Sequence, residues 1–350
     1  MGRRVSRTDV RLSDEQLPVF DGLLPPWPGQ DLAGVFVRTA PGPPTGGEPA
    51  LFVHGLGGAS TNWTDLMGLL AGRLEARALD LPGFGQSAPP ANGRYSLGTH
   101  VRAVVRLLEH QDRGPVHLFG NSLGGAVSTR VAAWRPDLVR TLTRDDRAVA
   151  ADVRHQLEIY GGPGRWTVEV DGGAVSITDA LDKLAGRRLA RQTPLQRAQA
   201  VLALCYGDPT TIPPKRLQEA ADEVARRMTL PYADAAFTGS LRGLIRSFVE
   251  RGPRNIWRQA ASVQAPTLLV WGTEDRLVDV SIAPRAFAVF PHARLLILPG
   301  VGHVAQLERP ETVARAFLAL REDLAAHRAT VGATLPTAES RGGTPGPHQP

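Results

Sequence analysis

A serine set between glycines is the part of the sequence best suited to covalent chemistry. The chain from Val116 to Val127 reads VHLFGNSLGGAV, which is an apolar strand pattern, a Gly-x-Ser-x-Gly turn and the start of a helical pattern. A sharp strand-to-helix turn strains the backbone of its central residue, so the positions two before and two after must lack bulk, as Gly120 and Gly124 do. We expect the Ser122 hydroxyl to be lifted above the sheet edge, where the helix amides favour developing negative charge.

A hydroxyl is a weak nucleophile, so it needs a base within hydrogen-bond reach and an acid that orients the base. Two apolar runs downstream end in glycine-bearing loops that carry such residues. Pro266 to Asp275 reads PTLLVWGTED, and Ala293 to His303 reads ARLLILPGVGH. Short apolar runs of this kind are typical of buried parallel strands, and parallel sheets place their chemistry at the carboxyl ends of the strands. The order Ser, Asp, His along the chain is one that such sites use.

Four segments of the chain together resemble the α/β-hydrolase family, in the branch that has a serine nucleophile, an inserted cap and esterase-like members. They are LFVHGLGG at Leu51–Gly58 with Trp63, LDLPGFGQS at Leu79–Ser87, the turn at Ser122, and Trp271–Asp275 with Gly302 and His303. The resemblance spans residues 50 to 320, apart from an unmatched stretch inside that range. It implies an α/β fold with a mostly parallel, doubly wound sheet and an inserted, mainly helical cap.

The resemblance also implies a role for individual residues. Ser122 would be the nucleophile, Asp275 the orienting acid and His303 the general base. The backbone amides of Leu56 and Leu123 would form the oxyanion hole. No cofactor or metal is implied, and the expected partner is a small-molecule substrate.

Other acidic residues compete with Asp275 for the role of orienting acid. Glu274 and Asp279 lie in the same loop, and the pair Asp145-Asp146 lies near the place where some family members carry their acid. We favour Asp275, because it occupies the position that matches the family pattern.

Position alone distinguishes His303 from the other histidines among the nine in the chain. Gly302 precedes it, and Pro310-Glu311 opens a predicted helix after it. His54 and Asp80 also lie within the matching motifs. We expect these two residues to shape loops and to take no part in the chemistry.

The activity that the resemblance implies is hydrolysis of a small, fairly apolar carboxylic ester through an acyl-enzyme. This activity is what remains after other activities of the family are argued against. Serine at position 122 argues against the relatives that use an aspartate nucleophile. Carbon-carbon bond hydrolases usually have a glycine run and an aromatic residue where Leu56 and Val304 stand, and iminopeptidases usually have tryptophan at the position of Leu123. Carbon-carbon bond or amide hydrolysis on the same fold stays open, as does a ligand-binding protein with little turnover.

Composition fits a large globular protein. The 350 residues are 42% hydrophobic, which is enough for a packed core, and the single Cys205 excludes an internal disulfide. No cysteine and histidine cluster has metal-ligand spacing, and no apolar run is long enough for a membrane span. No signal peptide is apparent, so we expect a cytoplasmic protein. The net charge of +6 is spread among nearly as many acids, which argues against a nucleic-acid partner. The oligomeric state is not predicted.

Breaks in the sequence pattern divide the chain into five parts. They are an N-terminal arm (1–30), the first part of the core (31–143), a cap insertion (144–260, with 144–178 atypical), the second part of the core (261–325) and a disordered tail (326–350). An apolar strand is expected to continue from Val139, but Arg144 and the acidic pair after it interrupt the apolar run. Residues 166–177 alternate like a hairpin about a glycine turn, which is unusual inside a helical cap.

Overall fold

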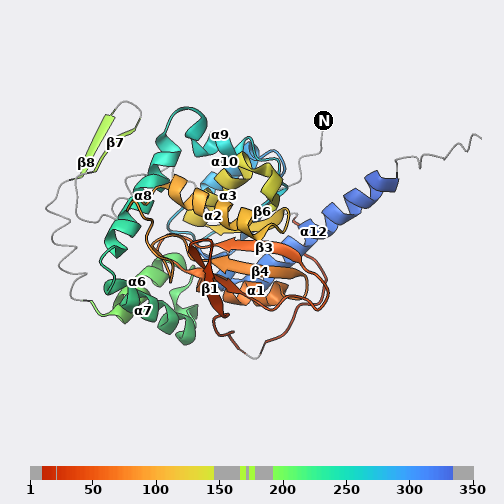
Figure 1. The fold of residues 1–350 in the computed structure, drawn as a ribbon, viewed down its shortest axis with the longest axis horizontal. Coiled ribbons are helices and arrows are strands. Elements are labelled where there is room, and N and C mark those ends of the chain that lie inside the picture. The colour runs from red at the N-terminus through yellow and green to blue at the C-terminus, as the bar shows by residue number, and fades with distance from the viewer. Residues whose placement is uncertain (1–9, 21, 146–165, 171–172, 178–191, 334–350) are drawn as a thin grey trace, which may run out of the picture.

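An eight-stranded sheet forms the centre of the protein (Figure 1). The computed structural model describes residues 10–20, 22–145, 166–170, 173–177 and 192–333. The sheet strands are β1 (Gly29–Leu32), β2 (Val35–Thr39), β3 (Glu48–Val53), β4 (Leu74–Leu79), β5 (Val116–Asn121), β6 (Val139–Asp145), β9 (Thr267–Gly272) and β10 (Ala293–Leu298). Their order is β1-β2-β4-β3-β5-β6-β9-β10, and all pairs from β4 to β10 are parallel. Only β1 and β2 run antiparallel to their neighbours. The predicted α/β class with a mostly parallel sheet is confirmed.

Helices cover both faces of this sheet. One face carries α2 (Leu97–Gln111), α3 (Leu123–Trp134), α9 (Ile256–Ala260) and α10 (Ala283–Val289), and the other carries α1 (Thr64–Leu70), α11 (Ala305–Glu308) and α12 (Pro310–Ala333). Short 3-10 turns are η1 (Ser60–Trp63), η2 (Pro136–Leu138), η3 (Pro209–Thr211), η4 (Gly252–Arg254) and η5 (Val280–Ile282).

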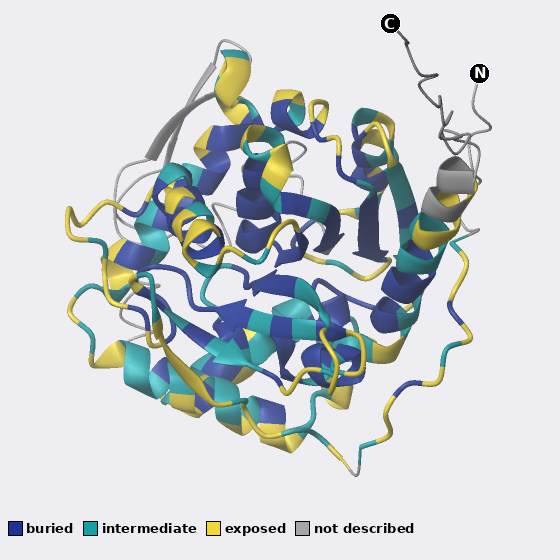
Figure 2. Ribbon diagram, turned by 45° about the vertical axis from the view of Figure 1, so that its right-hand side comes forward, coloured by how far each residue is buried: buried dark blue, intermediate teal, exposed yellow. Residues whose placement is uncertain are grey.

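The central strands are apolar along their whole length because both of their faces are covered. In β9, Leu269 and Trp271 join the buried cluster under α2 and α3, whereas Leu268 and Val270 join the cluster under α1 and α12. Figure 2 shows the consequence, since the sheet and the inward sides of the flanking helices are buried. This continuous burial is typical of a parallel sheet.

Among the described residues between β6 and β9, three helices precede α9 and lie apart from the layers that cover the sheet, and we call them the inserted helices. They are α6 (Pro194–Cys205), α7 (Pro214–Met228) and α8 (Ala233–Val249), and they lie together at one end of the sheet (Figure 1). Leu241 and Leu244 of α8 belong to the same buried cluster as α2 and α3, whereas α6 packs on α7 through a small cluster of its own. The described part of the insertion from residue 192 is thus helical, as predicted.

Two short strands lie outside the main sheet. β7 (Trp166–Val170) and β8 (Gly173–Ile177) pair antiparallel with each other, as the alternating pattern predicted. The rest of the atypical segment, residues 146–165, 171–172 and 178, lies outside the described residues.

Elements of the structure cross three of the predicted boundaries. β6 runs through Arg144 to Asp145, because the buried Arg144 guanidinium donates to Thr129 Oγ1 at 3.0 Å and stacks 5.7 Å from the ring centre of Phe290. Helix α12 continues to Ala333, past the predicted start of the tail at residue 326. Strand β1 begins within the predicted arm.

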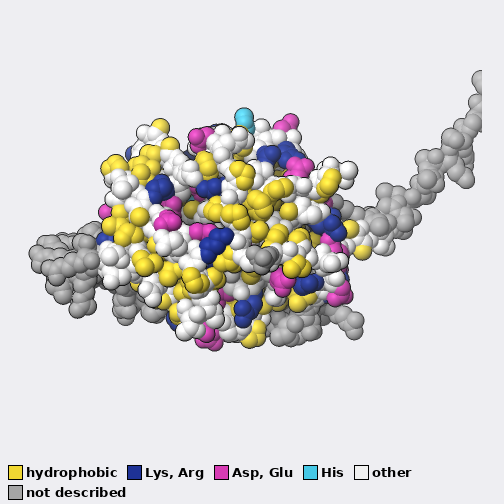
Figure 3. Space-filling model, turned by 90° about the horizontal axis from the view of Figure 1, so that it is seen from below, with side chains coloured by type: hydrophobic (Ala, Val, Ile, Leu, Met, Phe, Trp, Pro, Cys, Tyr) yellow, Lys and Arg dark blue, Asp and Glu magenta, His cyan; other side chains and the backbone are white. Residues whose placement is uncertain are grey.

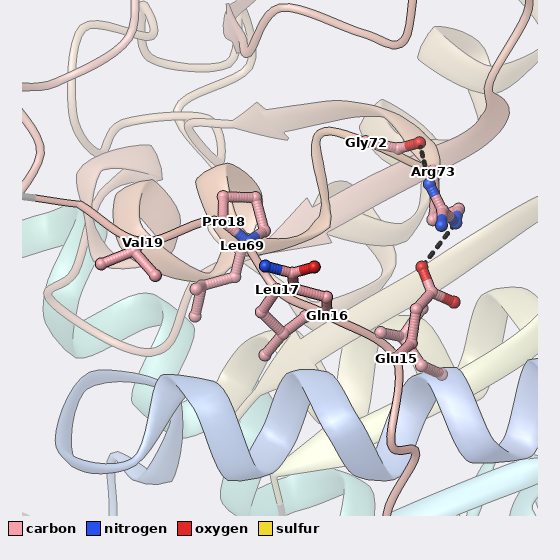
Figure 4. Close-up of a pocket in the computed structure, with 9 residues that line it drawn as sticks. Glu15, Gln16, Leu17, Pro18, Val19, Leu69, Gly72 and Arg73 are labelled. Atoms are coloured by element: carbon pink, nitrogen blue, oxygen red, sulfur yellow. Dashed lines mark hydrogen bonds and ion pairs between the residues drawn. The ribbon is translucent and has the colours of Figure 1, made fainter.

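The described surface holds a hollow beneath the N-terminal arm (Figure 4). It measures about 610 Å³ and lies between residues 15–19 of the arm, the end of α1 and Leu318 of α12. None of the residues that line it belongs to the predicted site. Arg73 closes one end through an ion pair with Glu15 at 2.5 Å.

Charges of both signs are mixed with apolar side chains on the face in Figure 3. Within the described residues, no helix is both long and apolar enough to cross a bilayer. The same part of the chain contains no group of three or more histidine, cysteine and acidic side chains that could hold a metal ion.

Candidate active site

Ser122 occupies a strained turn between β5 and α3. Its φ of 53° and ψ of −115° lie outside the regions that non-glycine residues favour, and the residue is buried. A Cβ atom at position 124 would lie 2.1 Å from the carbonyl oxygen of Val53, and one at position 120 would lie 2.5 Å from the carbonyl oxygen of Gly124. Both glycines are therefore required by close packing, as the motif predicted.

Asp275 and His303 meet at the carboxyl edge of the sheet. The His303 Nδ1 atom and the Asp275 Oδ2 atom are 2.8 Å apart, and their side chains are 4% and 3% exposed. The other carboxylate oxygen accepts hydrogen bonds from the amides of Leu277 at 2.8 Å and Val278 at 2.9 Å. The carboxylate is thus fixed in place, and a neutral imidazole that donates from Nδ1 has its acceptor lone pair on Nε2.

A direct hydrogen bond joins the loop of His303 to the turn of Ser122. The Asn121 side-chain amide donates to the backbone oxygen of His303 at 3.1 Å, and Asn121 immediately precedes the serine. The three residues predicted as nucleophile, acid and base therefore lie on connected loops at one edge of the sheet.

The residues predicted to supply the oxyanion amides belong to the two segments next to the serine. Leu123 is the first residue of α3, so its amide lies at the amino end of that helix. Leu56 follows Gly55, and a Cβ atom at position 55 would lie only 3.1 Å from Ser122 Cβ. The chain before Leu56 therefore passes directly beside the serine.

His54 and Asp80 hold loops together, in agreement with the expectation. His54 Nε2 accepts from the amide of Leu81 at 2.9 Å, and Nδ1 lies 2.7 Å from the carbonyl oxygen of Gly55. Burial lowers the pKa of His54, so its ring is neutral at pH 7. The Asp80 carboxylate accepts from two backbone amides, those of Ser60 at 2.6 Å and Gln86 at 2.8 Å.

The two competing acids in the loop of Asp275 are exposed and have other hydrogen-bond partners. Glu274 is exposed, and Asp279 is exposed and caps η5 by accepting from the Ser281 amide at 2.7 Å. Hydrogen bonds from the side chain and then the amide of Ser281 lower the pKa of Asp279. Asp145 ends β6, and Asp146 lies outside the described residues.

Several contacts at the site were not foreseen from the sequence. Arg227 of α7 is largely buried, which lowers its pKa, and it donates to the carbonyl oxygen of Gly57 at 2.8 Å, one residue past Leu56. Asn121 lies inside the serine motif, but no pattern marks its side chain as the anchor of His303. Arg276, which follows the acid, and Glu308 both bind the turn after α6, and neither has a signal in the sequence.

Comparison with known proteins places this geometry in context. Residues 50–316 match the model of the alpha/beta hydrolase family. The chain is similar to the dihydrolipoyllysine-residue acetyltransferase component of the acetoin cleaving system of Pseudomonas putida, with 31% identity over 274 residues, which are 78% of this chain. The match spans 63% of that relative's length.

Two further relatives carry different names. A 2-hydroxy-6-oxononadienedioate/2-hydroxy-6-oxononatrienedioate hydrolase of Cupriavidus pinatubonensis is 26% identical over 77% of this chain and 85% of its own length. Lipase 1 of Psychrobacter immobilis is 27% identical over 81% of this chain and 79% of its own.

A solved structure shares the fold. That of a thermophilic esterase from Thermogutta terrifontis superposes with a TM-score of 0.61 and 20% identity, over 83% of this chain and 94% of that one. The family match covers both parts of the core together with the insertion between them. The chain therefore belongs to the alpha/beta hydrolase family.

Proposed function

We propose that this protein is a serine hydrolase that cleaves a small, fairly apolar carboxylic ester. Ser122 is the nucleophile, His303 the general base and Asp275 the acid that orients it. The observation that carries the proposal is the buried contact of 2.8 Å between His303 Nδ1 and Asp275 Oδ2, on a loop tied to the strained serine turn. A base held by a third group beside a serine is the arrangement that activates a hydroxyl.

The proposed reaction proceeds in two steps. His303 Nε2 takes the proton of Ser122 as its oxygen attacks the ester carbonyl, and the imidazolium then protonates the leaving alcohol. Water, deprotonated by the same imidazole, hydrolyses the acyl-enzyme and restores the serine. The amides of Leu56 and Leu123 stabilise the negative oxygen in both steps, and each such donor contributes on the order of 10² to 10³ in rate.

The inserted helices are proposed to act as a cap that selects the substrate. α7 reaches the turn after Leu56 through Arg227, and Phe237 of α8 lies 3.3 Å from the position that a Cβ atom on Gly57 would take. A pocket built by these helices beside the oxyanion turn would bind the acyl or leaving group of the ester. The lipase relative supports an ester substrate, since ester hydrolysis is what that name denotes.

Carbon-carbon bond hydrolysis is the second candidate. The relative from Cupriavidus pinatubonensis favours it, because its name denotes hydrolysis of an oxo-dienedioate. The same triad would serve either reaction, so the substrate decides between them.

Turnover tests the proposal directly. We expect the protein to hydrolyse 4-nitrophenyl esters in a series from acetyl to dodecanoyl, and we expect Ser122→Ala to lose on the order of 10⁴ to 10⁶ in kcat. Ser262→Ala, which changes an exposed serine remote from the triad, is the matched control. Cleavage of a 2-hydroxy-6-oxo-dienoate with no ester turnover would favour the second candidate. An alanine variant at position 122 that keeps the wild-type rate on either substrate would refute the serine nucleophile.

A further inference from the structure

One turn of the inserted helices is held by both loops that carry the proposed acid and base. The turn runs from Cys205, the last residue of α6, to Gly207, just before η3. Tyr206 at its centre is buried, at 2% exposure, although it follows a half-exposed helix. This turn is therefore packed against the core.

A single carboxylate joins the turn to the loop of the base. Glu308 Oε2 accepts from the amide of Gly207 at 2.9 Å, and Oε1 accepts from the amide of Gly302 at 2.8 Å. The amide of His303 in turn donates to the carbonyl oxygen of Cys205 at 2.6 Å. His303 is thus hydrogen-bonded to the turn itself, and Gly302 is hydrogen-bonded to the carboxylate that binds the turn.

Arg276 holds the same turn from the side of the acid, since it follows Asp275. Its guanidinium donates to the carbonyl oxygen of Ala203 in the last turn of α6 at 2.7 Å, and to those of Tyr206 at 3.1 Å and Gly207 at 3.0 Å after the helix. The carbonyl of Ala203 is one of the last four of the helix, which have no partner within the helix.

The junction between this turn and the loop of the base is closely packed. A Cβ atom at position 302 would lie 2.2 Å from the carbonyl oxygen of Cys205, and one at position 207 would lie 2.4 Å from the carbonyl oxygen of Gly300. Backbone meets backbone here, so a movement of the turn must move the loop of the base with it.

We propose that Glu308 is a positioning residue that couples the inserted helices to the imidazole of His303. Because its two oxygens bind one amide on each side, the carboxylate sets the distance between the turn and the loop. The proposal deepens the proposed function and rests on it, since His303 has to act as the base for its position to affect the rate. Burial raises the pKa of Glu308, and the two amides that it accepts from oppose that effect.

The test removes one acceptor and keeps the size of the side chain. In Glu308→Gln one oxygen becomes an NH2 group that faces an amide N–H, so one of the two hydrogen bonds is lost. We expect kcat on a 4-nitrophenyl ester to fall about 10- to 100-fold, since small misplacements of catalytic groups cost that much, with KM changed less than about threefold. Glu311→Gln, at an exposed carboxylate on α12, is the matched control and should retain the wild-type kcat.

A second readout does not depend on turnover. In protein labelled with ¹⁵N-histidine, the imidazole resonances of His303, assigned by their loss in His303→Ala, should shift in Glu308→Gln and stay in place in Glu311→Gln. Gly207→Ala breaks the junction from the other side and should give the same pair of changes. If Glu308→Gln does not fold, Gly207→Ala provides the test in its place.

The outcomes separate the two proposals. A change in both kcat and the His303 resonances supports the coupling. A folded variant with a lower Tm but with either kcat or the His303 resonances unchanged overturns it and leaves Glu308 a residue that only stabilises the fold. If the wild type turns over neither substrate class, the proposed function has failed, and the resonances alone then decide whether Glu308 positions His303.

Discussion

His54 and His303 occupy similar places in the fold but have different partners. Each lies beside a glycine at the carboxyl edge of the sheet, and each is buried. Both ring nitrogens of His54 contact backbone atoms, the carbonyl oxygen of Gly55 and the amide of Leu81. In His303 the Nδ1 atom contacts a carboxylate instead. A ring held by backbone at both nitrogens can only brace loops, whereas a carboxylate on one side stabilises the proton that the other side takes up.

The largest effect is expected from removing the negative charge of Asp275, because contact with this carboxylate distinguishes His303 from His54. Asp275→Asn keeps the shape of the side chain, but we expect it to cost about 10⁴ in kcat, because an amide can hold the imidazole in the wrong tautomer. Measured on the same ester, Asp145→Asn and Asp146→Asn should each cost less than about tenfold. If Asp146→Asn lost most of its kcat while Asp275→Asn lost little, the acid would belong after β6 instead.

Changing His54 should affect stability and leave the chemistry nearly intact. In His54→Asn the shorter side chain can replace at most one of the two hydrogen bonds, which we expect to cost about 2 kcal/mol in the free energy of unfolding, measured in urea. The kcat of the folded variant should change less than about tenfold. A fall in kcat of about 10³ with unchanged stability would instead place His54 in the reaction.

The last comparison concerns His100, a second histidine in the region of His54, whose effect on stability is expected only as the pH falls. Burial, with a smaller contribution from His54, lowers its pKa to about 3, and its Nε2 lies 2.8 Å from Ser240 Oγ. Below about pH 6.5 the unfolded imidazole binds a proton that the folded one refuses, so stability falls with falling pH in that window.

Between about pH 7.5 and pH 5, His100 should therefore cost the wild type about 2 kcal/mol of unfolding free energy. We expect this part of the loss to be absent in His100→Gln, while losses from other buried histidines are common to both proteins. Parallel urea titrations at the two pH values measure the difference. Equal losses in the two proteins would contradict a neutral, buried His100.

Most of the fold could be predicted from local sequence, because strands covered on both faces read as apolar runs and glycines mark the tight turns. The end of β6 could not, because the charge of Arg144 is accommodated by Thr129 and Phe290, which lie elsewhere in the chain. The candidate site residues at strand ends could be proposed from these local patterns together with the family resemblance. The bond from Gly207 to Glu308 joins residues 101 positions apart, and no short pattern encodes it.

The most direct test of the central claim is to identify the residue that a phosphonofluoridate probe labels. Such a probe reacts with a serine that an adjacent base activates, so we expect peptide mapping of the labelled wild type to place one adduct on Ser122. Labelling of His303→Ala should be slower by a factor on the order of 10³ or more. An adduct on another residue, or equal labelling rates in the two proteins, would contradict a Ser122 nucleophile activated by His303.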